Sequence, residues 1–118
     1  MGIFSVEISV GDAAGEQWQE LYATVDTGAF ISSVPGSVLR HLEVSPTMQD
    51  TVRLADGTRR TVDIAYTWLK LNGQQVMTYI AFNEEGSTPL LGALTLEELW
   101  LGVDPREGRL FRLTDMPL

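Results

Sequence analysis

The chain has 118 residues, of which 44% are hydrophobic and 20% charged, with a formal net charge of −8 and no cysteine. This composition predicts one globular domain over residues 1–118 and excludes disulfides, thiolate metal sites and cysteine nucleophiles. An acidic surface repels nucleic acid and anionic membranes, so we expect neither as a partner. Because no apolar run has the length of a signal sequence or a membrane span, we expect a soluble, cytoplasmic protein.

The first third of the chain predicts three strands and a helix. Residues 3–10 alternate apolar and polar side chains, which is typical of a half-buried strand, and residues 18–25 form a second strand after a polar turn. Residues 31–34 form a short third strand. Pro35 then opens a short helix over about residues 36–41, because proline is tolerated in the first helical turn.

Residues 48–71 form the longest strand-like region, and Asp56-Gly57 near its centre is a dipeptide favoured in two-residue hairpin turns. After this turn, apolar residues alternate on one face. They are Val62, Ile64, Tyr66 and Trp68. The phase changes at Leu69, which predicts a bulge or bend near Trp68.

The remainder of the chain predicts a second tight hairpin turn at Asn72-Gly73 and a strand over residues 76–82. This strand is apolar on both faces, so we expect it in the centre of the sheet. Thr95 and Glu98 have the spacing of a capping box, which predicts that Thr95 caps a short helix and Glu98 reaches back to it.

A last strand is predicted over residues 109–113, and the fold class is therefore mainly β with short helices. One acid stands out in this pattern. Asp26 lies between two apolar segments, where a carboxylate is costly unless it is hydrogen-bonded, shares a proton or takes part in chemistry. The following Thr27-Gly28 supplies a hydroxyl, two backbone N–H groups and a residue free to adopt positive φ. An ordinary turn is the alternative interpretation of these three residues.

The order of motifs around this acid resembles the retropepsin-like aspartic proteases, and most closely the single-domain members of cellular organisms. Asp-Thr-Gly-Ala at residues 26–29 is followed by a hairpin tip at residues 55–58 and by Leu90-Leu91-Gly92 before a short helix. The similarity extends from about residue 3 to residue 113. It implies a closed acid-protease β-barrel with one lobe per chain, and aspartic endopeptidase activity without a cofactor or metal.

The resemblance also implies roles for individual residues. Asp26, Thr27 and Gly28 are the catalytic motif, in which Asp26 acts as general acid and base and Thr27 bonds across a dimer interface. The hairpin tip is a flap that closes over the substrate, although a plain hairpin turn is the alternative there. The implied substrate-binding residues are Ala29, Phe30, Ala55, Asp56, Gly57, Thr58, Ser87, Thr88, Pro89 and Leu90.

Two positions depart from the retroviral pattern. Retroviral members usually carry an acid two residues after the catalytic glycine and an arginine after the Leu-Gly turn, and these two side chains pair. Phe30 and Ala93 occupy these positions here. Because both partners are replaced together, no charge is left unpaired, and we expect an apolar contact in place of the ion pair.

A single Asp-Thr-Gly predicts that two chains are needed for catalysis. The chemistry requires two carboxylates that share one proton, and a two-fold axis brings Asp26 of one protomer beside Asp26 of another. We therefore expect a homodimer that cleaves extended peptides or proteins with apolar side chains beside the scissile bond. The resemblance implies that residues 3–8 and 109–113 contribute to its interface.

Other functions are less well supported by the sequence. A dimer with this fold that binds peptides or assists assembly without useful turnover is the main alternative. A triad of Ser32 or Ser33 with His41 lacks a nucleophile-elbow pattern. The acid pairs at residues 84–85 and 97–98 are simpler to explain as solvated charges than as metal ligands.

Overall fold

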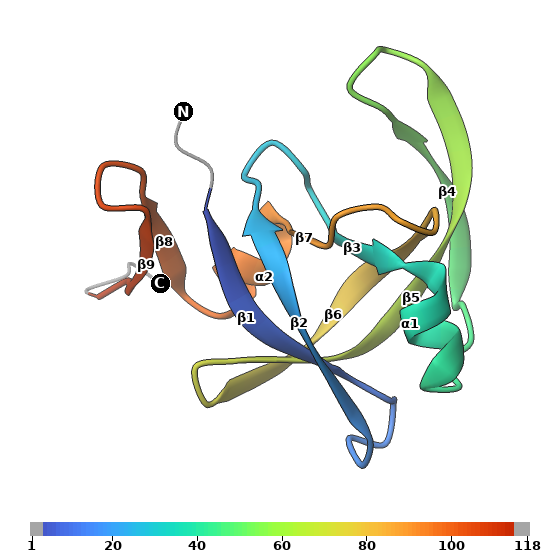
Figure 1. Cartoon of the computed structure of the whole chain (residues 1–118), viewed down its shortest axis with the longest axis horizontal. Helices are drawn as coiled ribbons and strands as arrows, with labels where there is room; N and C mark the ends of the chain where they lie inside the picture. Colours follow the sequence, from blue (N-terminus) through green and yellow to red (C-terminus); the bar gives the residue numbers. More distant parts are fainter. Residues whose placement is uncertain (1–3, 115–118) are drawn as a thin grey trace.

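The computed structural model describes residues 4–114, which form nine strands and two short helices (Figure 1). The strands are β1 (Ser5–Gly11), β2 (Trp18–Val25), β3 (Ser32–Pro35), β4 (Met48–Arg53), β5 (Arg59–Leu71), β6 (Gln74–Asn83), β7 (Leu90–Leu91), β8 (Leu101–Asp104) and β9 (Arg109–Arg112). The helices are α1 (Gly36–His41) and α2 (Ala93–Glu98). Residue 3, included in the predicted first strand, lies outside the described residues.

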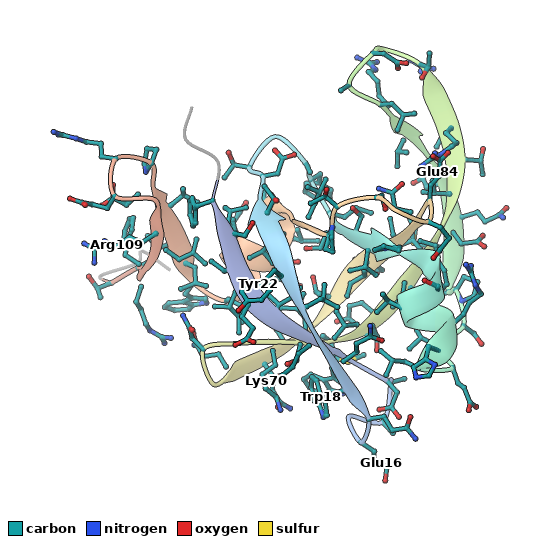
Figure 2. All side chains as sticks on the ribbon, viewed as in Figure 1. Glu16, Trp18, Tyr22, Lys70, Glu84 and Arg109 are labelled. Atoms are coloured by element: carbon teal, nitrogen blue, oxygen red, sulfur yellow. The ribbon has the colours of Figure 1, made fainter. Side chains whose placement is uncertain are left out.

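Seven strands form one sheet in the order β1-β2-β7-β3-β6-β5-β4, and β8 pairs with β9 in a separate two-stranded sheet. Strand β1 also pairs with β5 at Ser9–Lys70 and Val10–Leu69, which closes the large sheet into a barrel. Beside this closure, Lys70 Nζ lies 3.9 Å from the centre of the Trp18 ring (Figure 2). The mainly β, closed-barrel fold is therefore confirmed, as is the central position of β6 between β3 and β5.

The predicted bulge near Trp68 is wrong. Strands β5 and β6 pair in unbroken antiparallel register from Ile64–Ala81 to Leu71–Gln74. The change of phase instead lies at Ile64 and Ala65, which are consecutive and both buried. Ile64 belongs to a small apolar cluster and Ala65 to the main core. One face of the strand is buried up to Ile64, against the small cluster, and the opposite face is buried from Ala65 on, against the main core. Tyr66 is therefore 40% exposed.

The two predicted hairpin turns differ in the structure. At Asn72-Gly73 both residues have positive φ, 51° and 79°, as a two-residue type I′ turn requires, and this prediction is confirmed. The turn at Asp56-Gly57 is longer than predicted. Leu54 N–H donates to Thr58 O at 2.8 Å, and Gly57, with φ +89°, donates its N–H to Leu54 O at 2.9 Å. This pattern is typical of a three-residue loop closed by a glycine.

The predicted capping box is also wrong. Gly92 precedes α2, and no side chain caps the helix. Thr95 instead lies inside the helix and is fully buried. Its hydroxyl can be buried because it bonds to another buried hydroxyl, that of Ser32. Strand β8 was not predicted: the helix ends at Glu98, and Trp100 turns the chain with φ +60° before the strand begins. Within residues 4–114, neither helix is long and apolar enough to cross a membrane.

Candidate active site

Asp26 begins the loop that follows β2, and backbone bonds fix its position. Its N–H donates to Leu91 O at 3.0 Å, and its carbonyl accepts from Ala29 N–H at 3.1 Å. The carboxylate accepts from Gly28 N–H, with 2.9 Å between Gly28 N and Asp26 Oδ1. Asp26 is half-buried, whereas Thr27 and Gly28 are exposed. The loop therefore holds the carboxylate in a defined orientation and presents the next two residues at the surface.

The same loop is bound to the turn that begins α2. Ala93 N–H donates to Ala29 O at 2.8 Å, and Leu94 N–H donates to Phe30 O at 2.9 Å. Gly92 is required at this contact, because a Cβ there would lie 2.5 Å from the carbonyl carbon of Ile31. The expected apolar contact between Phe30 and Ala93 does not bury the Phe30 ring, which is 70% exposed. Backbone hydrogen bonds therefore join the two segments.

A pocket of about 670 Å³ lies between this loop and the β4–β5 hairpin. Its floor is the small apolar cluster of Val62, Ile64 and Ala81, against which Ile31 and Val52 pack. An apolar floor beside a carboxylate-bearing loop is suited to an apolar side chain of an extended ligand.

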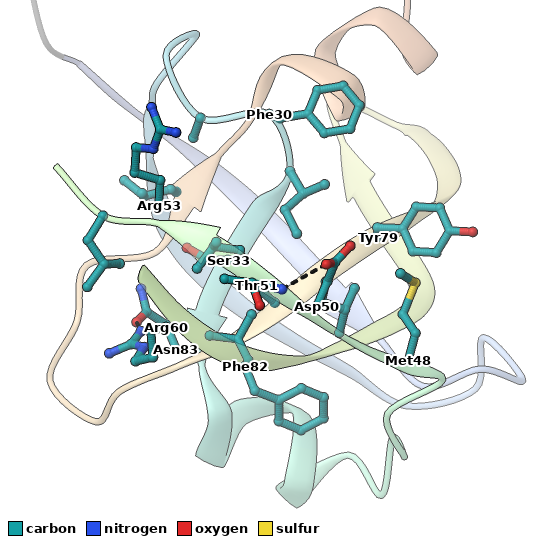
Figure 3. A pocket seen from close by; sticks show the side chains of 18 of the residues that line it. Phe30, Ser33, Met48, Asp50, Thr51, Arg53, Arg60, Tyr79, Phe82 and Asn83 are labelled. Atoms are coloured by element: carbon teal, nitrogen blue, oxygen red, sulfur yellow. Dashed lines mark hydrogen bonds between the residues drawn. The ribbon is translucent and has the colours of Figure 1, made fainter. Parts of the chain in front are cut away.

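The two ends of the pocket differ in chemistry. Figure 3 shows the Phe30 and Tyr79 rings with Met48 toward one end, and Arg53, Arg60 and Asn83 toward the other. Arg60 is held in place, because its guanidinium donates to Asn83 Oδ1 at 2.9 Å and pairs with Glu84. The aromatic end is open to apolar groups, and the other end offers guanidinium and amide donors to a ligand.

The structure brings only part of the predicted site to this pocket. Gly28, Ala29, Phe30 and Leu90 line it, and Asp26 and Thr27 lie on the same loop just before them. The predicted flap tip lies away from the pocket walls: Ala55, Asp56, Gly57 and Thr58 are all exposed and do not line it. Ser87, Thr88 and Pro89 are outside the lining too. Their roles in substrate binding stay predictions.

Strands β4 and β5 supply one wall of the pocket, and the tip of the predicted flap does not. These residues were missed by the sequence analysis and are Met48, Asp50, Thr51, Val52, Arg53, Leu54 and Arg60. The hairpin rises on the same side of the molecule as the loop between β2 and β3 (Figure 1). The signal that was available is Arg60 at the start of an alternating strand, directly after Arg59, because a cation at a half-buried strand position needs a partner.

Two carboxylates outside the pocket lining have pKa values below their usual range. Hydrogen bonds from the Thr58 side chain and backbone lower the pKa of Asp56, and the distances from its Oδ1 to Thr58 Oγ1 and N are 2.6 and 2.9 Å. Hydrogen bonding from Ser37, with a smaller contribution from Arg40, lowers the pKa of Glu85. Among residues 4–114, no three His, Cys, Asp or Glu side chains are grouped to hold a metal ion.

Comparison with known proteins identifies the fold. No family model and no curated protein sequence matches the chain. Solved structures do match. The protease of simian foamy virus (mac) is 22% identical with a TM-score of 0.59, over 81% of this chain and 94% of that one. The EIAV protease, solved with an inhibitor, is 17% identical with a TM-score of 0.57, over 81% of this chain and 86% of that one.

A cellular protein is similar to the same extent. The retroviral protease-like domain of Ddi1 from Leishmania major is 16% identical with a TM-score of 0.63, over 98% of this chain and 91% of that one. The chain therefore has the retropepsin-like fold predicted from its motifs.

Proposed function

We propose that this protein is an aspartic endopeptidase whose active site forms when two copies associate. The observation that carries the proposal is the Asp26 carboxylate, which Gly28 N–H orients at a distance of 2.9 Å. This carboxylate lies on a loop that borders the pocket in a retropepsin-like fold. Thr27 and Gly28 are exposed next to it, so a second chain has access to the same loop. A two-fold axis at this loop places the two Asp26 side chains together.

The chemistry follows from the pairing of two like charges. Carboxylates about 3 Å apart cannot both be ionised, so the pair shares one proton. The ionised Asp26 removes a proton from a water molecule, whose oxygen attacks the scissile carbonyl carbon, while the protonated Asp26 donates a hydrogen bond to the carbonyl oxygen. The C–N bond of the tetrahedral intermediate then breaks, and the leaving nitrogen takes up a proton from the pair of Asp26 carboxyl groups. The enzyme forms no covalent bond to the substrate.

The pocket supports an extended peptide as the substrate. Its floor of Val62, Ile64 and Ala81 accepts an apolar side chain, and the exposed Phe30 ring borders the same space. The β4–β5 hairpin closes over the bound chain, excludes water from the pair of carboxylates and strengthens their interactions with the substrate.

The test is cleavage of a randomised peptide library between about pH 3 and 7, with and without pepstatin. We expect pepstatin-sensitive cleavage, and a fall of at least about a hundredfold in kcat/KM for Asp26→Asn. Asp50→Asn is the matched control, because Asp50 lines the pocket but its carboxylate accepts the N–H of the next residue, Thr51. It should retain the greater part of the activity.

Analytical ultracentrifugation of the same samples completes the test. An active protein that stays monomeric at micromolar concentration contradicts the proposed dimer. A dimer that cleaves no peptide supports the alternative of a peptide-binding or assembly module. Cleavage retained by Asp26→Asn shows that the carboxylate is not part of the chemistry.

A further inference from the structure

Four side chains form a continuous line of hydrogen bonds beneath the Asp26 loop. Gly92 N–H donates to Ser32 Oγ at 3.0 Å, and Ser32 Oγ lies 2.7 Å from Thr95 Oγ1. Thr95 Oγ1 lies 2.9 Å from Thr78 Oγ1, whose hydroxyl donates to Glu98 Oε1 at 2.6 Å. The three hydroxyl residues are 0–1% exposed. The line joins β3, β6 and α2, and it ends at a carboxylate at the C-terminal end of α2.

The two ends of this line fix the direction of every bond in it. A backbone N–H can only donate, and an ionised carboxylate can only accept. Each hydroxyl has one proton, so Ser32 accepts from Gly92 and donates to Thr95, Thr95 donates to Thr78, and Thr78 donates to Glu98. Hydrogen bonds that all point the same way polarise one another, and an anion at the end strengthens the whole line.

We propose that Ser32, Thr78, Thr95 and Glu98 are positioning residues that hold the Asp26 loop through the Gly92 turn. This inference rests on the proposed function. The line is hydrogen-bonded to the backbone N–H of Gly92. The next two residues, Ala93 and Leu94, donate the N–H groups that bind Ala29 O and Phe30 O. A shift of Gly92 therefore moves the loop that carries the carboxylate, and small displacements of catalytic groups reduce the rate strongly.

The chain offers a matched comparison for this role. Thr67 is also fully buried, and its hydroxyl also makes a short hydrogen bond, to Gly11 O at 2.6 Å. That bond lies where β1 meets β5, and Thr67 lines no part of the pocket. Thr67→Val and Thr95→Val remove the same group from equally buried positions, but the Thr67 hydroxyl bonds one backbone carbonyl in the barrel seam, whereas the Thr95 hydroxyl belongs to the line that reaches the Asp26 loop. Exposed Glu97 provides the same comparison for half-buried Glu98.

The first measurement needs no activity. Amide hydrogen exchange of Ala93 and Leu94, followed by NMR in the full chain, reports the two bonds that bind the loop to α2. We expect exchange at both amides to rise by at least about tenfold in Thr95→Val and in Glu98→Ala, because local opening becomes easier. Thr67→Val and Glu97→Ala should leave both amides unchanged, and Thr95→Ser, which keeps the hydroxyl, should restore protection.

The second measurement is peptide cleavage. We expect kcat to fall by about ten- to a hundredfold in Thr95→Val with little change in KM, to recover in Thr95→Ser, and to stay near the wild-type value in Thr67→Val. Unchanged exchange in Thr95→Val, or equal effects of Thr95→Val and Thr67→Val, overturns the proposal. Faster exchange with unchanged kcat also overturns it. If the wild-type chain cleaves no peptide, the endopeptidase proposal fails, and the exchange measurement still decides whether the line holds the loop.

Discussion

The Asp26 loop and the β4–β5 hairpin border the same pocket, but the fold holds the loop and the tip of the hairpin in different ways. The loop is bound to the start of α2 by two backbone hydrogen bonds and is packed so closely that Gly92 has no space for a Cβ. The hairpin tip is exposed from Ala55 to Thr58, and a Cβ on Gly57 would meet no atom within 4 Å. Strand β4, which leads to it, pairs only with β5 among the described strands.

This difference separates two requirements of the proposed chemistry. A carboxylate that must meet its partner at a defined distance needs a backbone held by many contacts. A cover that admits and releases a peptide needs a segment with few contacts, because segments that open easily are those that bury little. The chain meets both requirements by giving the Asp26 loop buried partners and giving the hairpin tip mainly a local turn.

The largest expected effect comes from filling the space at Gly92. Gly92→Ala places a Cβ 2.6 Å from Ile31 O and 3.0 Å from Ala29 O, so the backbone of the Asp26 loop must move. We expect the free energy of unfolding, measured by urea denaturation, to fall by about 3 kcal/mol. Peptide cleavage should be lost with it. A variant of wild-type stability and activity would show that the loop is not rigidly packed.

The same substitution at the hairpin tip should have a smaller effect of a different origin. Gly57→Ala meets no neighbouring atom, and its cost arises only from the φ of +89° that the turn requires. We expect a loss of about 1–2 kcal/mol by the same urea measurement. Because the hairpin is proposed to close over the bound peptide and Gly57 is distant from the carboxylate loop in the chain, KM should change more than kcat. A loss equal to that of Gly92→Ala would contradict the contrast between the two regions.

Most of the fold could be predicted because the strands alternate clearly and the turns contain distinctive dipeptides. The tight turn at Asn72-Gly73 formed as expected, since both residues tolerate positive φ. Strand β5 was harder, because its two faces enter different apolar clusters and its pattern changes phase without a bulge. Strand β8 was missed because Leu99 and Trp100 continue the apolar face of α2 for two residues beyond the end of the helix.

The site was predictable where it depends on local sequence and unpredictable where it depends on tertiary contacts. Asp26-Thr27-Gly28 is recognisable because its residues are consecutive. Thr95 was interpreted as a helix cap because Ser, Thr and Asp are favoured there. Its true partners, Ser32 and Thr78, are 63 and 17 residues away in the chain. No local pattern indicates which of these hydroxyl groups will be buried together.

A weaker effect should come from the turn that closes the hairpin tip. Hydrogen bonds from Thr58 lower the pKa of Asp56 below its usual value of 3.8. The ionised carboxylate therefore stabilises the turn at pH values above 3.8, and this stabilisation is lost as the pH falls through the lower pKa of the folded protein. Thr58→Val removes the hydroxyl donor at 2.6 Å and should raise the Asp56 midpoint toward 3.8. NMR titration of the Asp56 carboxyl group measures this midpoint. Thr61→Val, on the exposed face of β5, is the control and should leave it unchanged.

The smallest effect is expected at Glu85, which fastens the loop after β6 to α1. Its Oε2 accepts from Ser37 N–H at 3.0 Å and from the Arg40 guanidinium at 3.3 Å, and both lower the pKa of Glu85 below 4.5. The Ser37 side-chain hydrogen bond is the largest cause of the lowered pKa, ahead of the Ser37 N–H, and the ion pair with Arg40 is exposed and screened by salt. Ser37→Ala should therefore raise the Glu85 midpoint, followed by NMR titration, more than Arg40→Gln does. High salt should remove the effect of Arg40→Gln and leave that of Ser37→Ala. The opposite ranking would show that the ion pair, and not the Ser37 side chain, is the larger cause of the lowered Glu85 pKa.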